Sequence, residues 1–202
     1  MSKIKHFIEQ SWLLIVSSFF FGLLIAVASA RWSPLIEYNE REKRNGLMEE
    51  LIRDANSFEV ALEAVEIPAR KGKPAKTDIY KAVDEQGSTV GFAFIAVGSG
   101  FADKIKLVIA VDGRCEKFFG FKVLASNETP GFGDKIKKDY LGNQFKGAPA
   151  GELVLVKTGD DKKIDSEIVA ISGATVSSEA VVKTFNVYID KIKEQLRAKG
   201  LI

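Results

Sequence analysis

Ser172-Gly173-Ala174-Thr175 is a stretch whose residue types and spacing could bind an anion. It lies between an apolar run, Ile168 to Ile171, and a long helical pattern that starts near Val176, so it predicts a turn from a strand into a helix. Gly173 allows a sharp bend there, and the first amides of a helix lack intrahelical partners and form the positive end of its dipole. A phosphate at this turn would find free amides and the hydroxyls of Ser172, Thr175, Ser177 and Ser178. The alternative is an ordinary N-cap that binds no ligand.

A second stretch, Asn127-Glu128-Thr129-Pro130-Gly131-Phe132-Gly133, has the composition of a rigid turn. Its proline and its two glycines favour a bend that brings backbone amides close to a ligand. Glu128 supplies the acidic side chain of this stretch. We expect its charge either to face the ligand or to point to solvent and cap the following turn.

These two stretches resemble the two signatures of the FMN-binding domain family. That family includes the G-type subunit of the Rnf ferredoxin:NAD oxidoreductase and the C-type subunit of the sodium-translocating NADH:quinone oxidoreductase, and the resemblance covers nearly the whole chain. It implies FMN joined to Thr175 by a phosphoester bond, although Val169 stands where many members have an aspartate. It also implies phosphate contacts at Ser172, Gly173, Ala174 and Ser177. Near the isoalloxazine ring it implies Asn127, Glu128, Thr129, Pro130, Gly131 and Gly133.

The resemblance further implies how the protein is matured and what it does. A separate flavin transferase would attach the FMN, because nothing in the sequence predicts a site for FAD and Mg²⁺. The domain would then relay electrons one at a time within a membrane-bound, ion-translocating complex of the Rnf type, without a complete catalytic site of its own. Other membrane subunits of that complex would be its partners. Three alternatives stay open: a C-type component of the quinone-reducing complex, a cofactor-free extracytoplasmic scaffold, and the flavin domain of a secreted reductase.

Composition excludes several other classes of protein. The 202 residues carry 29 Lys and Arg against 27 Asp and Glu, and no basic run is interleaved with aromatic residues, which disfavours nucleic-acid binding. Cys115 has no partner cysteine, so we predict no disulfide, iron–sulfur or zinc site within the chain and expect this side chain in the core. His6, the one histidine, lies in the N-terminal tail, which leaves the globular part without the usual general base and metal ligand.

Residues 11–30 form an uncharged run rich in Leu, Ile, Val and Phe. As a helix this run would span roughly 30 Å, the thickness of the hydrocarbon core of a bilayer, and Trp12 and Trp32 flank it at interfacial depths. We therefore predict a single transmembrane helix. The alternative is a signal peptide cleaved after Ala28-Ser29-Ala30. Either interpretation sends the C-terminal domain out of the cytoplasm. The family resemblance implies an anchor with residues 1–10 as a cytoplasmic tail and the main domain on the periplasmic side of a bacterial or archaeal inner membrane.

Beyond the anchor, the patterns predict an α+β protein whose helices cover a largely antiparallel sheet. We predict a juxtamembrane helix at residues 31–56, for which Ser33 and Pro34 indicate a helix start, and the resemblance implies that residues 57–202 form an extracytoplasmic FMN-binding domain. We predict a basic loop at residues 67–77. The other expected elements are strands at 58–65, 79–83, 89–97, 105–111, 115–124 and 152–157, a tight Asp112-Gly113 turn, a short polar helix at 134–140, and a final helix at 176–199.

Overall fold

The computed structural model describes residues 2–68 and 74–202, with side chains described from residue 11. Residues 69–73 of the expected basic loop, which include Arg70, Lys71 and Lys73, lie outside the described residues, and its two ends, Ile67 and 75–77, belong to strands. The chain divides into two units, one ending at Lys43 and one comprising Arg44–Ile202. Helix α1 (Ser2–Leu51) passes from the first unit into the second.

Helix α1 is continuous through Pro34, so the predicted helix start at Ser33 is wrong. An N-cap serine would accept a hydrogen bond from an amide ahead of it. The Ser33 hydroxyl instead donates to the carbonyl oxygen of Ser29, one turn back, at 2.8 Å. This backward bond is the one that serine makes inside a helix.

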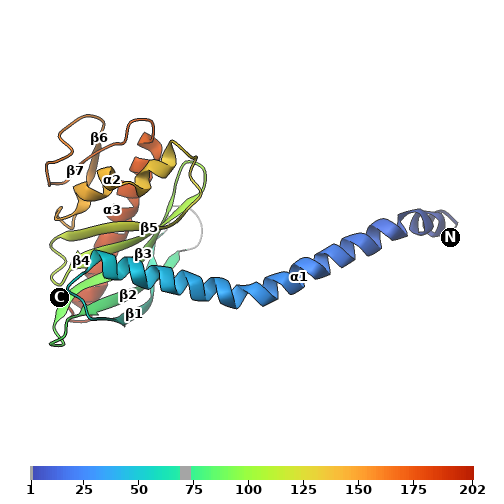
Figure 1. Ribbon diagram of the computed structural model, residues 1–202, viewed down its shortest axis with the longest axis horizontal. Coiled ribbons are helices and arrows are strands. Elements are labelled where there is room, and N and C mark those ends of the chain that lie inside the picture. The colour runs from blue at the N-terminus through green and yellow to red at the C-terminus, as the bar shows by residue number, and fades with distance from the viewer. Residues whose placement is uncertain (1, 69–73) are drawn as a thin grey trace. The chain divides into compact units, whose positions relative to one another are not determined.

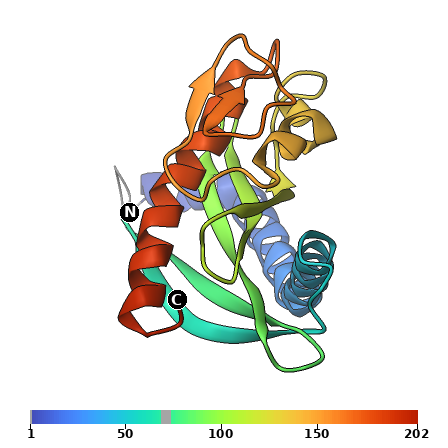
Figure 2. The same cartoon turned by 90° about the vertical axis from the view of Figure 1, so that its left-hand side faces the viewer.

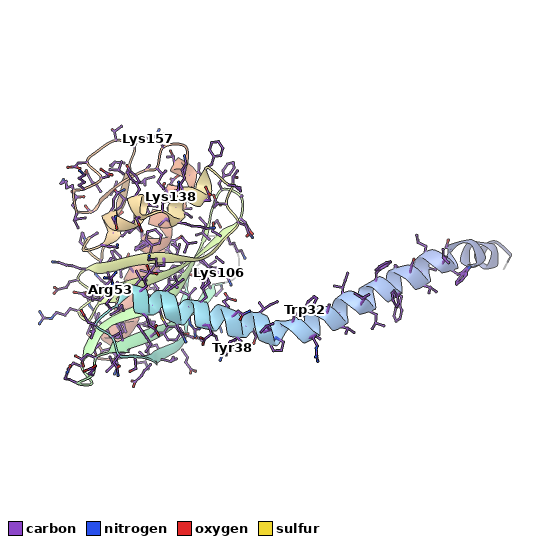
Figure 3. All side chains as sticks on the ribbon, viewed as in Figure 1. Trp32, Tyr38, Arg53, Lys106, Lys138 and Lys157 are labelled. Carbon is purple, nitrogen blue, oxygen red and sulfur yellow. The ribbon has the colours of Figure 1, made fainter. Side chains whose placement is uncertain are left out.

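The first unit consists of α1 alone, and its described side chains are mostly exposed. Trp32 and Tyr38 project from it and are 61% and 60% exposed (Figure 3). From Ser11 the helix is long and apolar enough to cross a membrane by length and composition, a test that an N-terminal signal sequence would also pass. The residues predicted as an anchor therefore lie in a helix that is long enough to cross a membrane.

The second unit is built on a five-stranded antiparallel sheet with the strand order β1-β2-β3-β4-β5 (Figure 1). Each strand pairs with the next along the chain, as expected from the succession of short apolar runs. The α+β class is confirmed. The strands are β1 (Ser57–Ile67), β2 (Ala75–Val83), β3 (Thr89–Ser99), β4 (Lys104–Asp112) and β5 (Phe118–Ser126).

Alternate residues of these strands enter two separate apolar clusters, one on each face of the sheet. Phe92 and Phe94 face the larger cluster, where α3 (Thr175–Ala198) covers the sheet. Ala93, between them, faces the smaller cluster together with Met48 from the end of α1. Figure 2 shows α3 along one face and the last turns of α1 on the other.

Helix α3 is held to the sheet by a stripe of apolar residues. The residues of this stripe are all buried: Ala180, Phe185, Tyr188, Ile189, Ile192 and Leu196. Tyr188 stacks on Phe94 with ring centroids 6.2 Å apart, and its hydroxyl oxygen accepts from the Val97 amide at 3.0 Å. The position of the N-terminus of α3 is therefore fixed by the core.

The predicted tight turn at Asp112-Gly113 is wrong. Asp112 pairs with Lys117 across a longer loop, because the Asp112 carboxylate accepts from the amides of Glu116 and Lys117. The positive φ of this loop falls on Cys115, at 53°, and not on Gly113. Cys115 is buried, as expected, and burial raises the pKa of its thiol to about 12.

After β5 the chain forms a 3-10 helix, η1 (Gly133–Lys137), and then α2 (Asp139–Phe145), in place of the one polar helix predicted at 134–140. Lys138 is extended between them, and Leu141 and Phe145 draw the second helix into the core. The sequence did not predict this break at Lys138, because polar residues on both sides of it hide the end of one helix and the start of the next.

The last strands, β6 (Val154–Val156) and β7 (Glu167–Val169), form a separate parallel pair. Gln144 of α2 holds the end of β7: its amide oxygen accepts from the Val169 amide at 2.7 Å, and its amide nitrogen donates to the Val169 carbonyl at 3.1 Å. These two hydrogen bonds fix the point at which the chain leaves β7 and enters the turn at Ser172.

The close approach of α3 to β3 requires a glycine at position 98. A Cβ on Gly98 would overlap Oγ1 of Thr184 and come within 3.2 Å of Cβ of Thr184. Gly98→Ala should therefore destabilise the protein by about 1–3 kcal/mol, and Thr184→Ala should recover part of that loss. Urea unfolding of the full chain in detergent measures both effects. Gly142→Ala, where a Cβ meets nothing within 4 Å, is the matched control, and an unchanged midpoint for Gly98→Ala would contradict the close packing of α3 on β3.

Candidate functional site

The N-terminus of α3 is left without a cap. Gly173, at φ +78°, turns the chain into the helix, and Ala174 occupies the N-cap position with no side-chain hydrogen bond. The first bond of the helix runs from the Ser178 amide to the Ala174 carbonyl at 2.9 Å. Among the described residues, no acceptor pairs with the amides that precede it, those of Thr175, Val176 and Ser177. These amides are donors available to an external anion.

The four hydroxyls at this turn have different environments. Ser178 is buried, donating to the Ala174 carbonyl and accepting from the Ile171 amide at 3.1 Å. Ser177 is buried and donates to Glu128. Ser172 is exposed, and the half-buried Thr175 has a hydroxyl that is not enclosed and has no partner among the described residues. Thr175 therefore presents its oxygen outward, next to the unpaired amides.

The structure brings the Asn127–Gly133 stretch against this helix end, although 38 residues separate Gly133 from Ser172 in the sequence. The Ser177 hydroxyl hydrogen-bonds to Oε2 of Glu128. A Cβ on Gly133 would lie 2.6 Å from Oγ of Ser177 and would also overlap the Glu128 carboxylate, so this position requires glycine. A Cβ on Gly173 would lie 3.8 Å from the Phe132 ring.

Glu128 does not point to solvent; that alternative is wrong, because its side chain is 5% exposed. Its Oε1 accepts from the Ala102 amide at 3.0 Å, in the turn between β3 and β4. Burial by itself would raise the pKa of this carboxyl. The Ser177 hydroxyl and the amides of the Phe101–Asp103 turn outweigh that effect and hold the pKa below the ordinary value of a glutamate.

The remaining residues of the stretch form an exposed turn. Asn127 donates from Nδ2 to Oδ2 of Asp103 at 3.0 Å. The Thr129 carbonyl accepts from the amides of Phe132 and Asp134 at 3.2 and 3.3 Å, which closes the turn around the exposed Pro130 and Gly131. Gly131 takes a φ of +78°, which glycine adopts without strain. Their expected contact with a flavin ring stays a prediction.

Sequence reasoning missed two residues of η1, of which the fold brings one, Lys135, to the Ser172 turn. Lys135 donates from Nζ to the Ser172 carbonyl at 3.3 Å. Asp134 has a buried carboxylate oxygen, Oδ1, that no described residue donates to. No pattern in the sequence could have found either, because Lys135 is one of three lysines within four positions and nothing in their order separates it from Lys137 and Lys138.

A phosphate fits this set of groups. The free hydroxyl of Thr175 stands beside three unpaired amides at the positive end of a 24-residue helix, and a lysine ammonium lies at the same turn. Within the described ranges, no group of three His, Cys, Asp or Glu side chains could hold a metal ion. The chemistry of the site is that of an anion-binding helix end with an attached nucleophilic oxygen.

Comparison with known proteins decides the family. The sequence model of the FMN-binding domain matches residues 100–190, which include both motifs and η1. The G-type subunit of the proton-translocating ferredoxin:NAD(+) oxidoreductase complex of Clostridium ljungdahlii is 30% identical over 181 residues, 89% of this chain and 88% of that protein. The chain belongs to the family of G-type subunits of ion-translocating oxidoreductase complexes. The resemblance inferred from the two motifs is confirmed.

Another G-type subunit and two solved structures are also similar to this chain. The G-type subunit of the ion-translocating oxidoreductase complex of Methanosarcina acetivorans is 28% identical over 195 residues, 96% of this chain and 99% of that protein. The crystal structure of Shewanella oneidensis NqrC superposes with a TM-score of 0.53 at 22% identity, covering 72% of this chain and 73% of that one. The C-type subunit of a Na(+)-translocating NADH-quinone reductase from Parabacteroides distasonis gives 0.53 at 18% identity, covering 77% and 94%. These structural similarities show a shared fold.

The buried Glu128 should make stability depend on pH. Its folded pKa is lowered, so its contribution is present above about pH 4.3, the ordinary value for glutamate, and is lost as the pH falls through the folded value. Glu128→Gln should cost about 1–3 kcal/mol at pH 7, and the gap to wild type should close as the pH is lowered toward 3. Urea unfolding of the full chain between pH 7 and pH 3 tests this.

Glu59→Gln, at an exposed glutamate of β1, is the control and should follow the wild-type curve throughout. A gap for Glu128→Gln that stays constant with pH would mean that the carboxylate charge contributes nothing to the junction between the loop and α3.

Proposed function

We propose that this protein is an electron-transfer subunit of a membrane-bound, ion-translocating ferredoxin:NAD oxidoreductase and that it carries FMN on Thr175 through a phosphoester bond. One observation carries the proposal: in a chain of the G-type family, the Thr175 hydroxyl is free and unenclosed, among the described residues, at the uncapped N-terminus of α3. When bound, FMN supplies one-electron redox chemistry that no side chain of the protein can provide.

The residues around Thr175 would hold the phosphate and the flavin in complementary ways. The backbone of Ser172, Gly173 and Ala174 forms the turn, and the free amides at the start of α3 donate to the phosphate oxygens. Ser177 acts through Glu128, with which it ties the loop to the helix. The exposed turn of Thr129, Pro130 and Gly131, with Asn127 and the tightly packed Gly133, would border the isoalloxazine ring.

Attachment would be a phosphoryl transfer from FAD to the Thr175 hydroxyl. A bond forms between Oγ1 of Thr175 and the FMN phosphorus of FAD, the P–O–P bond of FAD breaks, AMP leaves, and the hydroxyl proton passes to a base. The described residues near Thr175 include no histidine and no cluster for Mg²⁺. A separate flavin transferase would therefore supply that base and the metal ion.

We further propose that residues 11–30 anchor the protein by a single pass, with residues 1–10 in the cytoplasm, residues 31–56 next to the membrane and residues 57–202 on the extracytoplasmic side of the inner membrane. The apolar helix and the G-type relatives support an anchored subunit. Its partners would be the other membrane subunits of the complex. The similarity to a G-type subunit over 89% of the chain favours the ferredoxin:NAD type of complex over the quinone type.

Thr175→Val should abolish covalent flavin when the full chain is co-expressed with a flavin transferase, because valine keeps the shape of threonine and removes the attacking oxygen. Thr175→Ser should retain some attachment. In-gel flavin fluorescence after denaturation measures both. Thr158→Val, at an exposed threonine, is the control and should stay fluorescent. Thr184 cannot substitute, because it is buried and donates to the Ala180 carbonyl at 2.7 Å. A fluorescent valine variant would place the linkage elsewhere.

The N-terminal helix should remain in the mature protein and hold it in the membrane. Washing membranes with alkaline carbonate should leave the chain in the pellet, and its intact mass should include residues 1–30. A mature chain that starts at Arg31 would instead identify the segment as a cleaved signal peptide.

A further inference from the structure

Lys135 is the lysine of η1 whose side chain lies over the Ser172 turn. Its Nζ donates to the Ser172 carbonyl at 3.3 Å and lies 3.6 Å from where a Cβ of Gly173 would be. It also stands over the Phe132 ring, 5.9 Å from the ring centroid, where the face of an aromatic ring attracts a cation. Contacts from both motifs therefore fix its ammonium group beside the start of α3.

This ammonium is not neutralised by the protein. Within residues 2–68 and 74–202, Lys135 is paired with no carboxylate, whereas Lys81, Lys122 and Lys163 each form an ion pair. An ammonium has three donors, and one goes to the Ser172 carbonyl, so two remain for an anion. Lys138, labelled in Figure 3, is exposed, and its backbone is extended between η1 and α2.

We propose that Lys135 binds the flavin phosphate and supplies its positive counter-charge, an inference that rests on the proposed attachment of FMN to Thr175. A phosphodiester carries one negative charge, and the N-terminus of a helix offers about half a positive charge. The α3 amides alone leave the phosphate partly uncompensated, and Lys135 supplies the remainder from its place at the Ser172 turn. The uncapped Ala174 position fits this arrangement, because the phosphate would take the place of a capping side chain.

Protection of the lysine from chemical acylation tests the contact. The full wild-type chain is prepared in detergent with covalent FMN, by co-expression with a flavin transferase, and without it, by expression in its absence. Both forms are treated with limiting acetic anhydride, and acetylation is measured at each lysine by peptide mass spectrometry. Attachment should lower acetylation of Lys135 by about tenfold, as expected for an amine engaged by a charged group. Lys137 and Lys138 of the same molecules are internal controls and should change little.

Substitutions that remove the Lys135 charge distinguish two explanations for protection: binding of the phosphate by the ammonium, and mere coverage of the side chain by the flavin. The urea midpoint is compared with and without covalent FMN for wild type, Lys135→Met, Lys135→Arg and Lys137→Met. The stabilising shift on attachment should be retained in the arginine variant and in Lys137→Met, and reduced in Lys135→Met, which keeps most of the length of the side chain without its charge. A shift in Lys135→Met equal to that of wild type would overturn the proposal.

The two proposals fail in different ways. A wild-type chain that never acquires covalent flavin would sink the assignment of Thr175. If wild type acquires covalent FMN but Lys135 is acetylated to the same extent with and without it, only the proposed role of Lys135 is refuted. The acetylation experiment uses wild type only, so it decides even when Lys135→Met accepts no flavin.

Discussion

A buried carboxylate joins the three segments that form the candidate site. Glu128 comes from the stretch after β5, accepts from Ser177 on α3, and accepts from Ala102 in the turn between β3 and β4. Burying a charge is costly unless donors replace the water that it loses, and here each oxygen has a donor from a different segment. The site exists as a unit because this one group is satisfied only when all three segments are in place.

Two glycines make that burial possible. A Cβ on Gly100 would overlap Oε1 of Glu128, and a Cβ on Gly133 would overlap its Oε2. Glycine at these positions lets the backbone close around the carboxylate. The second residue belongs to the Asn127–Gly133 stretch, so its composition serves internal packing as well as any ligand. The structural role of the motif and its proposed flavin contact lie on opposite sides of the same turn, the buried side at Glu128 and the exposed side at Pro130.

The first backbone amides of α3 have no hydrogen-bond acceptor among the described residues, whereas both carboxylate oxygens of Glu128 accept hydrogen bonds. A long helix ordinarily gains stability from a capping side chain, yet Ala174 provides none, and the amides that follow are unpaired among the described residues. The buried stripe of α3, including Phe185 and Tyr188, supplies enough packing to hold the helix without a cap. The protein can thus leave this end open, and Lys135 lies beside it with no acidic partner in the described chain. An open, positively charged helix end beside a free hydroxyl supports the phosphoester that we propose on Thr175.

The sequence by itself determined the family, the α+β class, the largely antiparallel sheet and the final helix, because these depend on local periodicity and on two contiguous motifs. It also located Thr175. Only the tertiary structure decided that Glu128 is buried, that the Ser177 and Ser178 hydroxyls are engaged by the protein, and that Lys135 rather than Lys137 or Lys138 stands at the turn. The structure also shows a longer loop in place of the predicted Asp112-Gly113 turn, and a continuous helix where a helix start was predicted at Ser33. In each case the outcome depends on a partner distant in sequence or on competition between backbone and side-chain hydrogen bonds, and neither leaves a signal in residue type or spacing.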